Sequence, residues 1–457
     1  MRLKIAGGRV FDPAQDWRGE IRDLYVDGDR LVPRFSKADT VIEARGQAVV
    51  PGGIDLRGQV ATFGLNFLRL WGLVPNHTEL GEMYALQGYT HVHEPFLTLA
   101  TAGYVHRELA ALPLVDVSAS LVINLRDLDL VLKDKDRLAE LAETLRFFQE
   151  KSRTLNFRVM EPWVRHRQEF YSYRTLPLAE ALEVLARLAG ELKTTLMVEA
   201  SPELLESALP EPQAFHLSGV GPALSADELV DKALAHLELG TTADLGFIWP
   251  QEISGRNGVP AHMDLGLSQP LRLKPAAVKP AARRALILAL GADNAPAAYS
   301  GAGAVQAPVA HYADFFAWLG NRQARQEFWG EELGGRRYSF FDWVSATRTL
   351  PARLLGLADR GRLEPGARAD LALFDLPPDM EDRWPERVRC CRTLIKSGVV
   401  VVENGRLVRA EAPRAACYRR TGAASTPLVE EMCQYRSFRR ENQWRLVDQE
   451  GLAWAEV

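Results

Sequence analysis

Cysteine is scarce in this sequence of 457 residues: it has four, all in the C-terminal part of the chain. Cys390 and Cys391 are adjacent, which disfavours a disulfide between them, so we expect a reducing, cytoplasmic environment. No uninterrupted apolar run approaches the ~20 residues of a membrane-spanning helix. The first residues, MRLKIAGGRVFD, contain no signal-peptide core. The sequence therefore predicts neither membrane insertion nor secretion.

A strong excess of charge of one sign is also missing. The formal net charge is −4, and acidic and basic residues are intermixed. We therefore expect no nucleic-acid or anionic-membrane surface, and proteins or small molecules are the expected partners. Several catalytic motifs are absent as well, namely G-x-S-x-G, a phosphate-binding loop followed by Lys-Ser/Thr, and C-x-x-C.

The segments that are present favour an α/β protein. Hydrophobic residues make up 47% of the chain, which is enough for a well-packed core. Short strand-like runs bounded by Gly, Asp or Pro come first, such as RLKIAGGRVFD and RDLYVDGDRLV. From residue 85 to about residue 291, strand-like runs alternate with long helical ones, which predicts a parallel barrel or a doubly wound sheet.

Strand-like runs return near the C-terminus, in ADLALFDL and RCCRTLIKSGVVVVENGRLV. We therefore expect one small β domain built from residues 1–50 and 355–410, beside a barrel of residues 51–354. The remaining extension, residues 411–457, is charged and aromatic. It has two interpretations, a tail packed on the surface or an arm that docks a partner.

Both ends of the expected barrel carry stretches that resemble the amidohydrolase superfamily. VIEARGQAVVPGGID is similar to the segment leading into its first barrel strand, and TRTLPARLLGLADRGRLEPGARADLALFD is similar to its C-terminal return. The resemblance implies an α/β fold with a TIM-like (β/α)8 barrel and a small β-sandwich domain built from both chain ends.

Further stretches resemble the A subunits of formylmethanofuran dehydrogenase and of the formyltransferase/hydrolase complex: FGLNFLRLWG, YALQGYTHVHEP, AFHLSGVG and LGADNAPAAYSGAGAVQAPVAHYADFFAWLGNRQARQEF. This resemblance covers most of the first 410 residues. It implies one-carbon metabolism, the other subunits of a multisubunit complex as partners, and a formylated furan carrier as a ligand. In that family a zinc-dependent barrel hydrolyses or forms an N-formyl amide.

Most of the family's zinc ligands are replaced in this chain. Arg57 and Gln59 stand where the first strand would supply two histidines, and a guanidinium, which is always protonated, cannot bind a cation. Arg158 stands at the position of the bridging lysine, and Glu199 stands where a further histidine is expected. The resemblance thus implies a degenerate metal site.

Two positions keep residues of the family type. His216 is a ligand-type histidine, and Asp293 is the carboxylate that would move a proton. Two such residues do not make a dinuclear zinc site, so we expect no metal cofactor.

Arg57 and Arg158 leave three interpretations of the site open. In the first, they supply the positive charge of the lost zinc in a buried ion-pair network with Asp293 and Glu199. In the second, the site has collapsed and Arg57 reaches solvent. In the third, a different set of residues binds a metal. We expect the first interpretation, the ion-pair network.

His91 and His93 form an H-x-H pair on one face of an expected strand, a spacing that is compatible with metal binding. The matching segment of the family has no ligand there. We therefore expect both histidines to be hydrogen-bonded core or rim residues.

These observations lead to three functional hypotheses. The first is a protein resembling the A subunits of such complexes but without the dinuclear zinc site, which acts as a scaffold or in modified carrier binding. The second is an active metal-dependent N-formyl amide hydrolase with a non-standard ligand set and Asp293 as general base. The third is a stand-alone interaction protein with no link to one-carbon chemistry.

Overall fold

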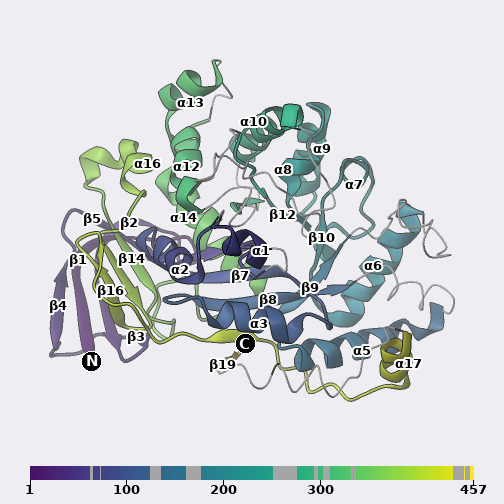
Figure 1. Cartoon of the computed structure of the whole chain (residues 1–457). Helices are drawn as coiled ribbons and strands as arrows, with labels where there is room; N and C mark the ends of the chain where they lie inside the picture. The colour runs from purple at the N-terminus through teal and green to yellow at the C-terminus, as the bar shows by residue number, and fades with distance from the viewer. Residues whose placement is uncertain are drawn as a thin grey trace.

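The computed structural model describes residues 1–61, 65–72, 74–123, 135–160, 177–250, 275–292, 297–301, 309–330, 333, 336–435, 447 and 453–457. Within these residues the strands form a nine-stranded mixed sheet and a ten-stranded, largely parallel sheet. Figure 1 shows the mixed sheet at one side of the molecule and the parallel strands, with helices outside them, at the other. The fold class expected from the sequence is confirmed.

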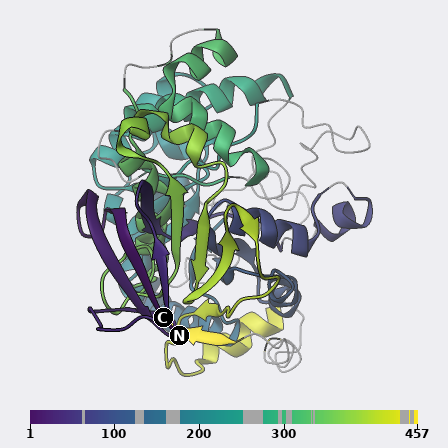
Figure 2. The ribbon, with the colours of Figure 1, turned by 90° about the vertical axis from the view of Figure 1, so that its left-hand side faces the viewer.

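Both ends of the chain contribute to the mixed sheet. Its strands are β1 (Arg2–Asp12), β2 (Trp17–Asp27), β3 (Arg30–Val32), β4 (Thr40–Glu43), β5 (Gln47–Pro51), β14 (Leu371–Asp375), β15 (Thr393–Lys396), β16 (Val399–Glu403) and β17 (Arg406–Leu407). β5 pairs antiparallel with β14 along its whole length, so early and late strands lie side by side (Figure 2). A separate apolar core lies under this sheet and includes Leu3, Ile5, Leu371 and Ile395.

The barrel strands follow one another in sequence order and pair in parallel. They are β6 (Gly53–Asp55), β7 (Tyr89–Leu97), β8 (Asp116–Ile123), β9 (Asn156–Val159), β10 (Leu196–Glu199), β11 (Phe215–Ser218), β12 (Thr242–Asp244) and β13 (Ala297–Ala298). Within the described residues β13 and β6 do not pair with each other. A π-helical segment, η4 (Ser345–Thr349), contacts both strands at this seam.

Helices cover the outside of the barrel strands because their buried faces repeat with helical spacing. In α6 (Leu178–Leu192), for example, the buried residues include Leu182, Leu185 and Leu188. The other barrel helices are α1 (Leu65–Leu70), α2 (His77–Leu86), α3 (Ala102–Ala110), α5 (Leu138–Lys151), α7 (Pro202–Glu206), α8 (Val220–Ala223), α9 (Glu228–Glu238), α10 (Pro275–Gly291), α12 (Tyr312–Gly320), α13 (Arg322–Trp329), α14 (Phe340–Val344) and α15 (Leu350–Leu355).

Short helical segments complete the secondary structure. They are η1 (Lys135–Arg137), η2 (Pro212–Ala214), η3 (Val309–His311), η5 (Pro378–Arg383), α16 (Trp384–Arg387) and α17 (Pro427–Tyr435). None of the helices in the described part of the chain combines the length and apolar character needed to cross a membrane.

The C-terminal extension joins the barrel sheet. β18 (Ala416–Tyr418) pairs in parallel with β8, and β19 (Trp454–Glu456) pairs in parallel with β18. Helix α17 packs against α5. The described parts of the extension therefore pack on the barrel, in line with the first of its two interpretations. The domain boundaries themselves stay a prediction.

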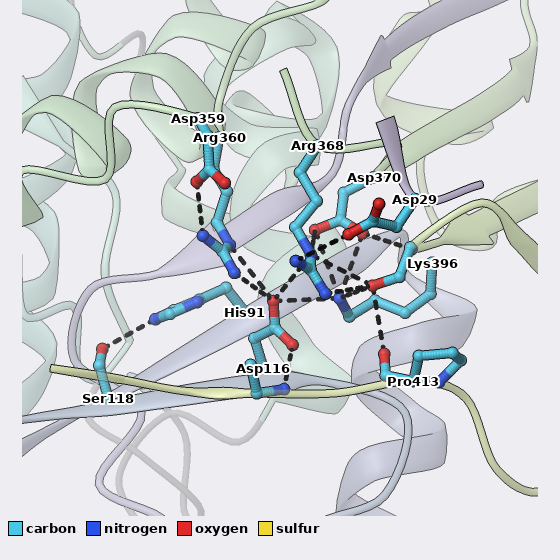
Figure 3. A network of polar contacts seen from close by, with 12 residues as sticks. Asp29, His91, Asp116, Ser118, Asp359, Arg360, Arg368, Asp370, Lys396 and Pro413 are labelled. Atoms are coloured by element: carbon cyan, nitrogen blue, oxygen red, sulfur yellow. Dashed lines mark hydrogen bonds and ion pairs between the residues drawn. The ribbon is translucent and has the colours of Figure 1, made fainter. Parts of the chain in front are cut away.

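A buried ionic network joins the β domain to the barrel (Figure 3). Asp116, at the start of β8, accepts hydrogen bonds from Arg360 at 2.8 Å and from the Ala415 backbone N–H at 2.7 Å, and its carboxylate lies 3.0 Å from Lys396 Nζ. Lys396 also lies 3.1 Å from Asp370 Oδ1. The network lies at the N-terminal ends of the barrel strands, where TIM-like barrels keep their stabilising contacts.

Candidate functional site

The candidate site lies at the C-terminal ends of the barrel strands. In a parallel barrel these ends converge on one face, which is where such folds build their active sites. Arg158 belongs to β9, Glu199 ends β10, Ser218 ends β11 and Asp244 ends β12. Arg57 follows the end of β6 by two residues. All five side chains are buried.

Arg57, Glu199 and Arg158 form a buried ionic triad, called the Arg–Glu–Arg triad below. Arg57 Nη2 donates to Glu199 Oε1 at 2.5 Å, and Arg158 donates to Glu199 Oε2 through both Nη2 and Nε, the latter at 3.2 Å. Burial lowers the pKa of the Arg158 guanidinium, whereas the Glu199 carboxylate opposes that shift. One carboxylate therefore holds two guanidinium groups in place.

The surroundings of Arg57 are shaped to admit its guanidinium. The guanidinium carbons of Arg57 and Arg158 lie 5.8 and 4.9 Å from the ring centroid of Phe96, within cation–π range. Gly219 has a φ of +65°, and a Cβ added there would lie 1.8 Å from Arg57 Nη1. A side chain at position 219 would therefore collide with Arg57.

Asp244 is the centre of a second set of hydrogen bonds. Its carboxylate accepts from Ser218 Oγ, from Ser300 Oγ, from the Gly219 N–H at 3.1 Å and from His216 Nε2 at 3.0 Å. Burial alone would raise the pKa of Asp244. The bond from His216 and the nearby arginines nevertheless hold that pKa below its usual value.

Ser218 connects the two sets. Arg158 Nη2 donates to Ser218 Oγ at 2.7 Å, and Ser218 donates to Asp244. His216 uses its other ring nitrogen, Nδ1, to contact Thr242 Oγ1 at 2.9 Å. The triad and Asp244 therefore belong to one continuous polar network.

Asp55 fixes the turn that carries Arg57. Its Oδ1 accepts from the Arg57 backbone N–H at 3.0 Å, and its Oδ2 accepts from the hydroxyls of Tyr84 and Tyr312 at 2.7 and 2.6 Å. Burial raises the pKa of this carboxyl group. Gln59, two residues after Arg57, has a left-handed φ of +45° and lies buried beside the site.

His91 and His93 belong to a separate chain of hydrogen bonds through the barrel. His93 contacts Ser118 Oγ through Nδ1 at 2.8 Å and Ser120 Oγ through Nε2 at 2.7 Å, and Ser120 donates to Asn156 Oδ1. His91 Nε2 contacts Ser118 at 2.8 Å. Both ring nitrogens of His93 thus have serine partners, and the pair lies in the core, as expected.

The residues at the site do not suit a zinc ion. Arg57 and Arg158 have no lone pair to offer, Glu199 is held by both of them, and His216 is bonded through both ring nitrogens. In the part of the chain that the structure describes, no group of three or more His, Cys, Asp or Glu side chains could hold a metal ion. The donor set of the described residues therefore does not fit dinuclear zinc chemistry.

Sequence reasoning named some of these residues and missed others. Asp293 precedes β13 in the sequence and lies outside the described residues. Ser300 follows β13, and its hydroxyl donates to Asp244. Asp55, Ser218 and Asp244 were not predicted as site residues. The signal that could have found them is their position, because each ends a strand-like run at the face where parallel strands converge.

Comparisons with known proteins support the same architecture. Residues 287–402 match the family model described as "Amidohydrolase family". Protein FwdA of Methanocaldococcus jannaschii is 23% identical over 90% of this chain and 89% of its own length. The A subunit of the formyltransferase/hydrolase complex Fhc of Methylorubrum extorquens is 23% identical over 89% of each chain.

A solved structure aligns over the whole molecule. One chain of the crystal structure of the formyltransferase/hydrolase complex FhcABCD from Methylorubrum extorquens, in complex with methylofuran, aligns with a TM-score of 0.80 and 20% identity. The alignment covers 100% of this chain and 99% of that one. The chain therefore shares its fold with that chain, is similar to FwdA and to the Fhc A subunit over about nine-tenths of its length, and matches an amidohydrolase family model over residues 287–402.

Proposed function

We propose that this protein is an FwdA-like component of a formyltransferase/hydrolase-type complex in cytoplasmic one-carbon metabolism, in which an ionic triad stands in place of the dinuclear zinc site. It acts there as a scaffold or as a modified subunit that binds a formylated furan carrier. The similarity to FwdA and to the Fhc A subunit over about nine-tenths of the chain supports membership in such a complex.

The Arg–Glu–Arg triad is the observation that carries the proposal. Its two guanidinium groups bring two fixed positive charges into a buried site. A zinc ion placed beside them would be repelled, and Glu199 could bind it only at the expense of its pairing with Arg57 or Arg158. The triad thus occupies the positions from which the resemblance would draw ligands, and its one carboxylate is already paired with both guanidinium groups.

Metal content tests the missing zinc site directly. Protein purified with zinc present, dialysed and analysed by metal mass spectrometry is expected to carry no stoichiometric zinc. A zinc-dependent amidohydrolase taken through the same steps is the positive control. Two zinc ions per chain would contradict the proposal, and a His216→Ala variant would then show whether that histidine is a ligand.

Hydrolysis assays distinguish the proposal from an active hydrolase. We expect no hydrolysis of an N-formyl furan amide by the purified chain, with or without added zinc. Zinc-dependent turnover that is lost in an Asp293→Ala variant would instead favour an active enzyme with a non-standard ligand set.

Complex formation is tested by co-expression. The tagged chain is produced together with the other formyltransferase/hydrolase-type subunits from the same genome and analysed by size-exclusion chromatography. Co-elution at a defined stoichiometry is expected. If the chain elutes alone in every combination, or if its genome encodes no such subunits, a stand-alone interaction protein becomes the better hypothesis.

A further inference from the structure

The seam between β13 and β6 contains a fully buried arginine. Arg348 lies in the π-helical segment η4, and its relative exposure is 0%. The same segment accepts a main-chain hydrogen bond at Ala346 O from the Tyr299 N–H, at 2.9 Å. Such π-helical turns are rare and occur frequently at functional sites.

Aromatic side chains surround this guanidinium. Its central carbon lies 3.7 Å from the ring centroid of Trp343, 5.6 Å from that of Tyr89 and 6.0 Å from that of Phe374. Burial lowers the pKa of Arg348 to about 10, which leaves the group protonated at neutral pH. Among the described residues no carboxylate forms an ion pair with it, unlike Arg57 and Arg158.

One edge of the Arg348 guanidinium carries two hydrogen-bond donors without acceptors. Nη1 donates to Thr347 Oγ1, whereas Nε and Nη2 have no hydrogen-bond partner within the described structure. Nε–H and Nη2–H point the same way from one side of the group. This is the edge with which arginine binds carboxylates and other anions through two parallel hydrogen bonds.

Two neighbouring side chains also present unpartnered donors. The hydroxyl of Tyr89 and the indole N–H of Trp343 are buried and lack partners among the described residues. Burial raises the pKa of Tyr89 and of the nearby Cys391 thiol, so neither side chain supplies a negative charge at neutral pH. Buried donors without acceptors are costly, and both of these belong to rings that lie within cation–π range of the Arg348 guanidinium.

We propose that Arg348 and Tyr89 form a binding site for one small monovalent anion of halide size, held by the Nε–Nη2 edge of Arg348 and by the Tyr89 hydroxyl. The anion neutralises the charge of the guanidinium. It accepts hydrogen bonds from donors that have no partner within the described structure. Its binding stabilises the seam between β13 and β6. The site uses none of the triad residues and is independent of the function proposed above.

Bromide provides a direct probe of this site. Crystals of the full chain grown or soaked in sodium bromide are expected to show an anomalous peak beside the Nε–Nη2 edge of Arg348. A data set from crystals kept in sodium gluconate is the control. If no anomalous peak appears at this edge, or if only a water fits the density there in bromide, the proposal is wrong.

Thermal unfolding tests the same site in solution. Replacing gluconate by bromide or chloride at constant ionic strength is expected to raise the Tm saturably by about 2 °C in the wild type, because the ligand binds only the folded state. The dependence is expected to disappear in Arg348→Met and to weaken in Tyr89→Phe, which keeps the ring but removes the hydroxyl.

Arg325→Met is the matched control, because Arg325 is a buried arginine whose Nη1 donates to the carbonyls of Trp318 and Leu319 and whose Nη2 donates to that of Arg336. Only its Nε lacks a partner in the described structure, so it has no edge with two unpartnered donors. It is expected to lower the Tm and to keep the full anion dependence. If Arg348→Met does not fold, Tyr89→Phe and the bromide crystals decide. A Tm that is the same in all three salts, or an unchanged dependence in Tyr89→Phe, would overturn the proposal.

Discussion

At the scale of single residues, the triad shows how permanently charged side chains can be buried in a barrel. Neither Arg57 nor Arg158 can lose its charge at neutral pH, so each requires a fixed counter-charge. Glu199 supplies it, and Asp244 adds a second carboxylate through Ser218. Removal of one member of such a set leaves the others unpaired in a medium of low polarity.

Glu199→Gln is therefore expected to lower the free energy of unfolding by roughly 3–5 kcal/mol, because both guanidinium groups lose their buried counter-charge. Urea denaturation followed by circular dichroism measures the change. Glu431→Gln, which removes the partly exposed ion pair with Arg137, is the control and is expected to have no measurable effect. Equal free energies of unfolding for the Glu199 variant and the wild type would show that the triad contributes nothing to stability.

His91 makes stability depend on pH. Burial lowers its pKa to about 3, so the folded state holds it neutral while the unfolded chain takes up a proton below about pH 6.5. The contribution of this group is complete above pH 6.5 and is lost progressively as the pH falls towards 3. At pH 5 the loss amounts to about 2 kcal/mol.

His91→Gln is expected to flatten the pH dependence between pH 6.5 and 5, because the amide keeps a donor for Ser118 but does not titrate. Unfolding free energies at several pH values, at constant ionic strength, provide the measurement. Parallel curves for the two proteins in this range would contradict the assignment of His91 as a neutral core residue.

At the scale of the elements, the loop after β11 is matched to the segment after β6. Gly219 leaves β11 in the left-handed conformation, and Arg57 occupies the space that a side chain at position 219 would fill. With Arg57 in this position, the turn after β11 therefore requires glycine at position 219.

Gly219→Ala is expected to destabilise the protein, because the added Cβ collides with Arg57 Nη1 and because the alanine backbone would have to adopt an unfavourable positive φ. Gly190→Ala is the matched control. Gly190 lies inside α6 with no atom near the added Cβ, so alanine there is expected to stabilise by about 0.5–1 kcal/mol. Thermal unfolding compares the two variants, and a neutral effect at position 219 would argue against the close packing of Arg57.

At the scale of the whole molecule, the β domain and the barrel are joined through charge. Asp116 belongs to the barrel, whereas Arg360, Asp370 and Lys396 belong to the return of the chain into the β domain (Figure 3). Burial opposes ionisation of Asp116, but Lys396 and Arg360 hold the pKa of its carboxyl group below the usual value. Its contribution to stability is present above about pH 3.8 and is lost as the pH falls below that value.

Lys396→Met is expected to cost roughly 3–5 kcal/mol, because two buried carboxylates lose their shared cation. Denaturant unfolding monitored by two probes measures the loss of stability and shows whether the β domain and the barrel unfold in separate transitions. Limited proteolysis provides an independent measure. Arg420→Met, which removes an exposed ion pair with Glu456, is the control. Unchanged, single-step unfolding of the Lys396 variant would show that the domains are held together by other contacts.

The fold could be predicted from local patterns in the sequence. Alternating strand-like and helical runs predicted a parallel barrel or a doubly wound sheet, and the resemblance favoured the barrel. Similar runs near both termini predicted one shared β domain, and β5 pairs with β14 accordingly. The insertion of β18 beside β8 was not predicted, because a three-residue strand carries too little periodicity to stand out in the sequence.

The sequence by itself determined that residues 57 and 158 carry guanidinium groups, which bind no metal at any position in any fold, because that property belongs to the side chain. Only the tertiary structure decided their partners. Glu199 is 142 residues from Arg57, and Asp244 is joined to the triad through Ser218. Such pairings depend on which strand ends converge, and strand convergence is a property of the closed sheet that no local stretch of sequence encodes.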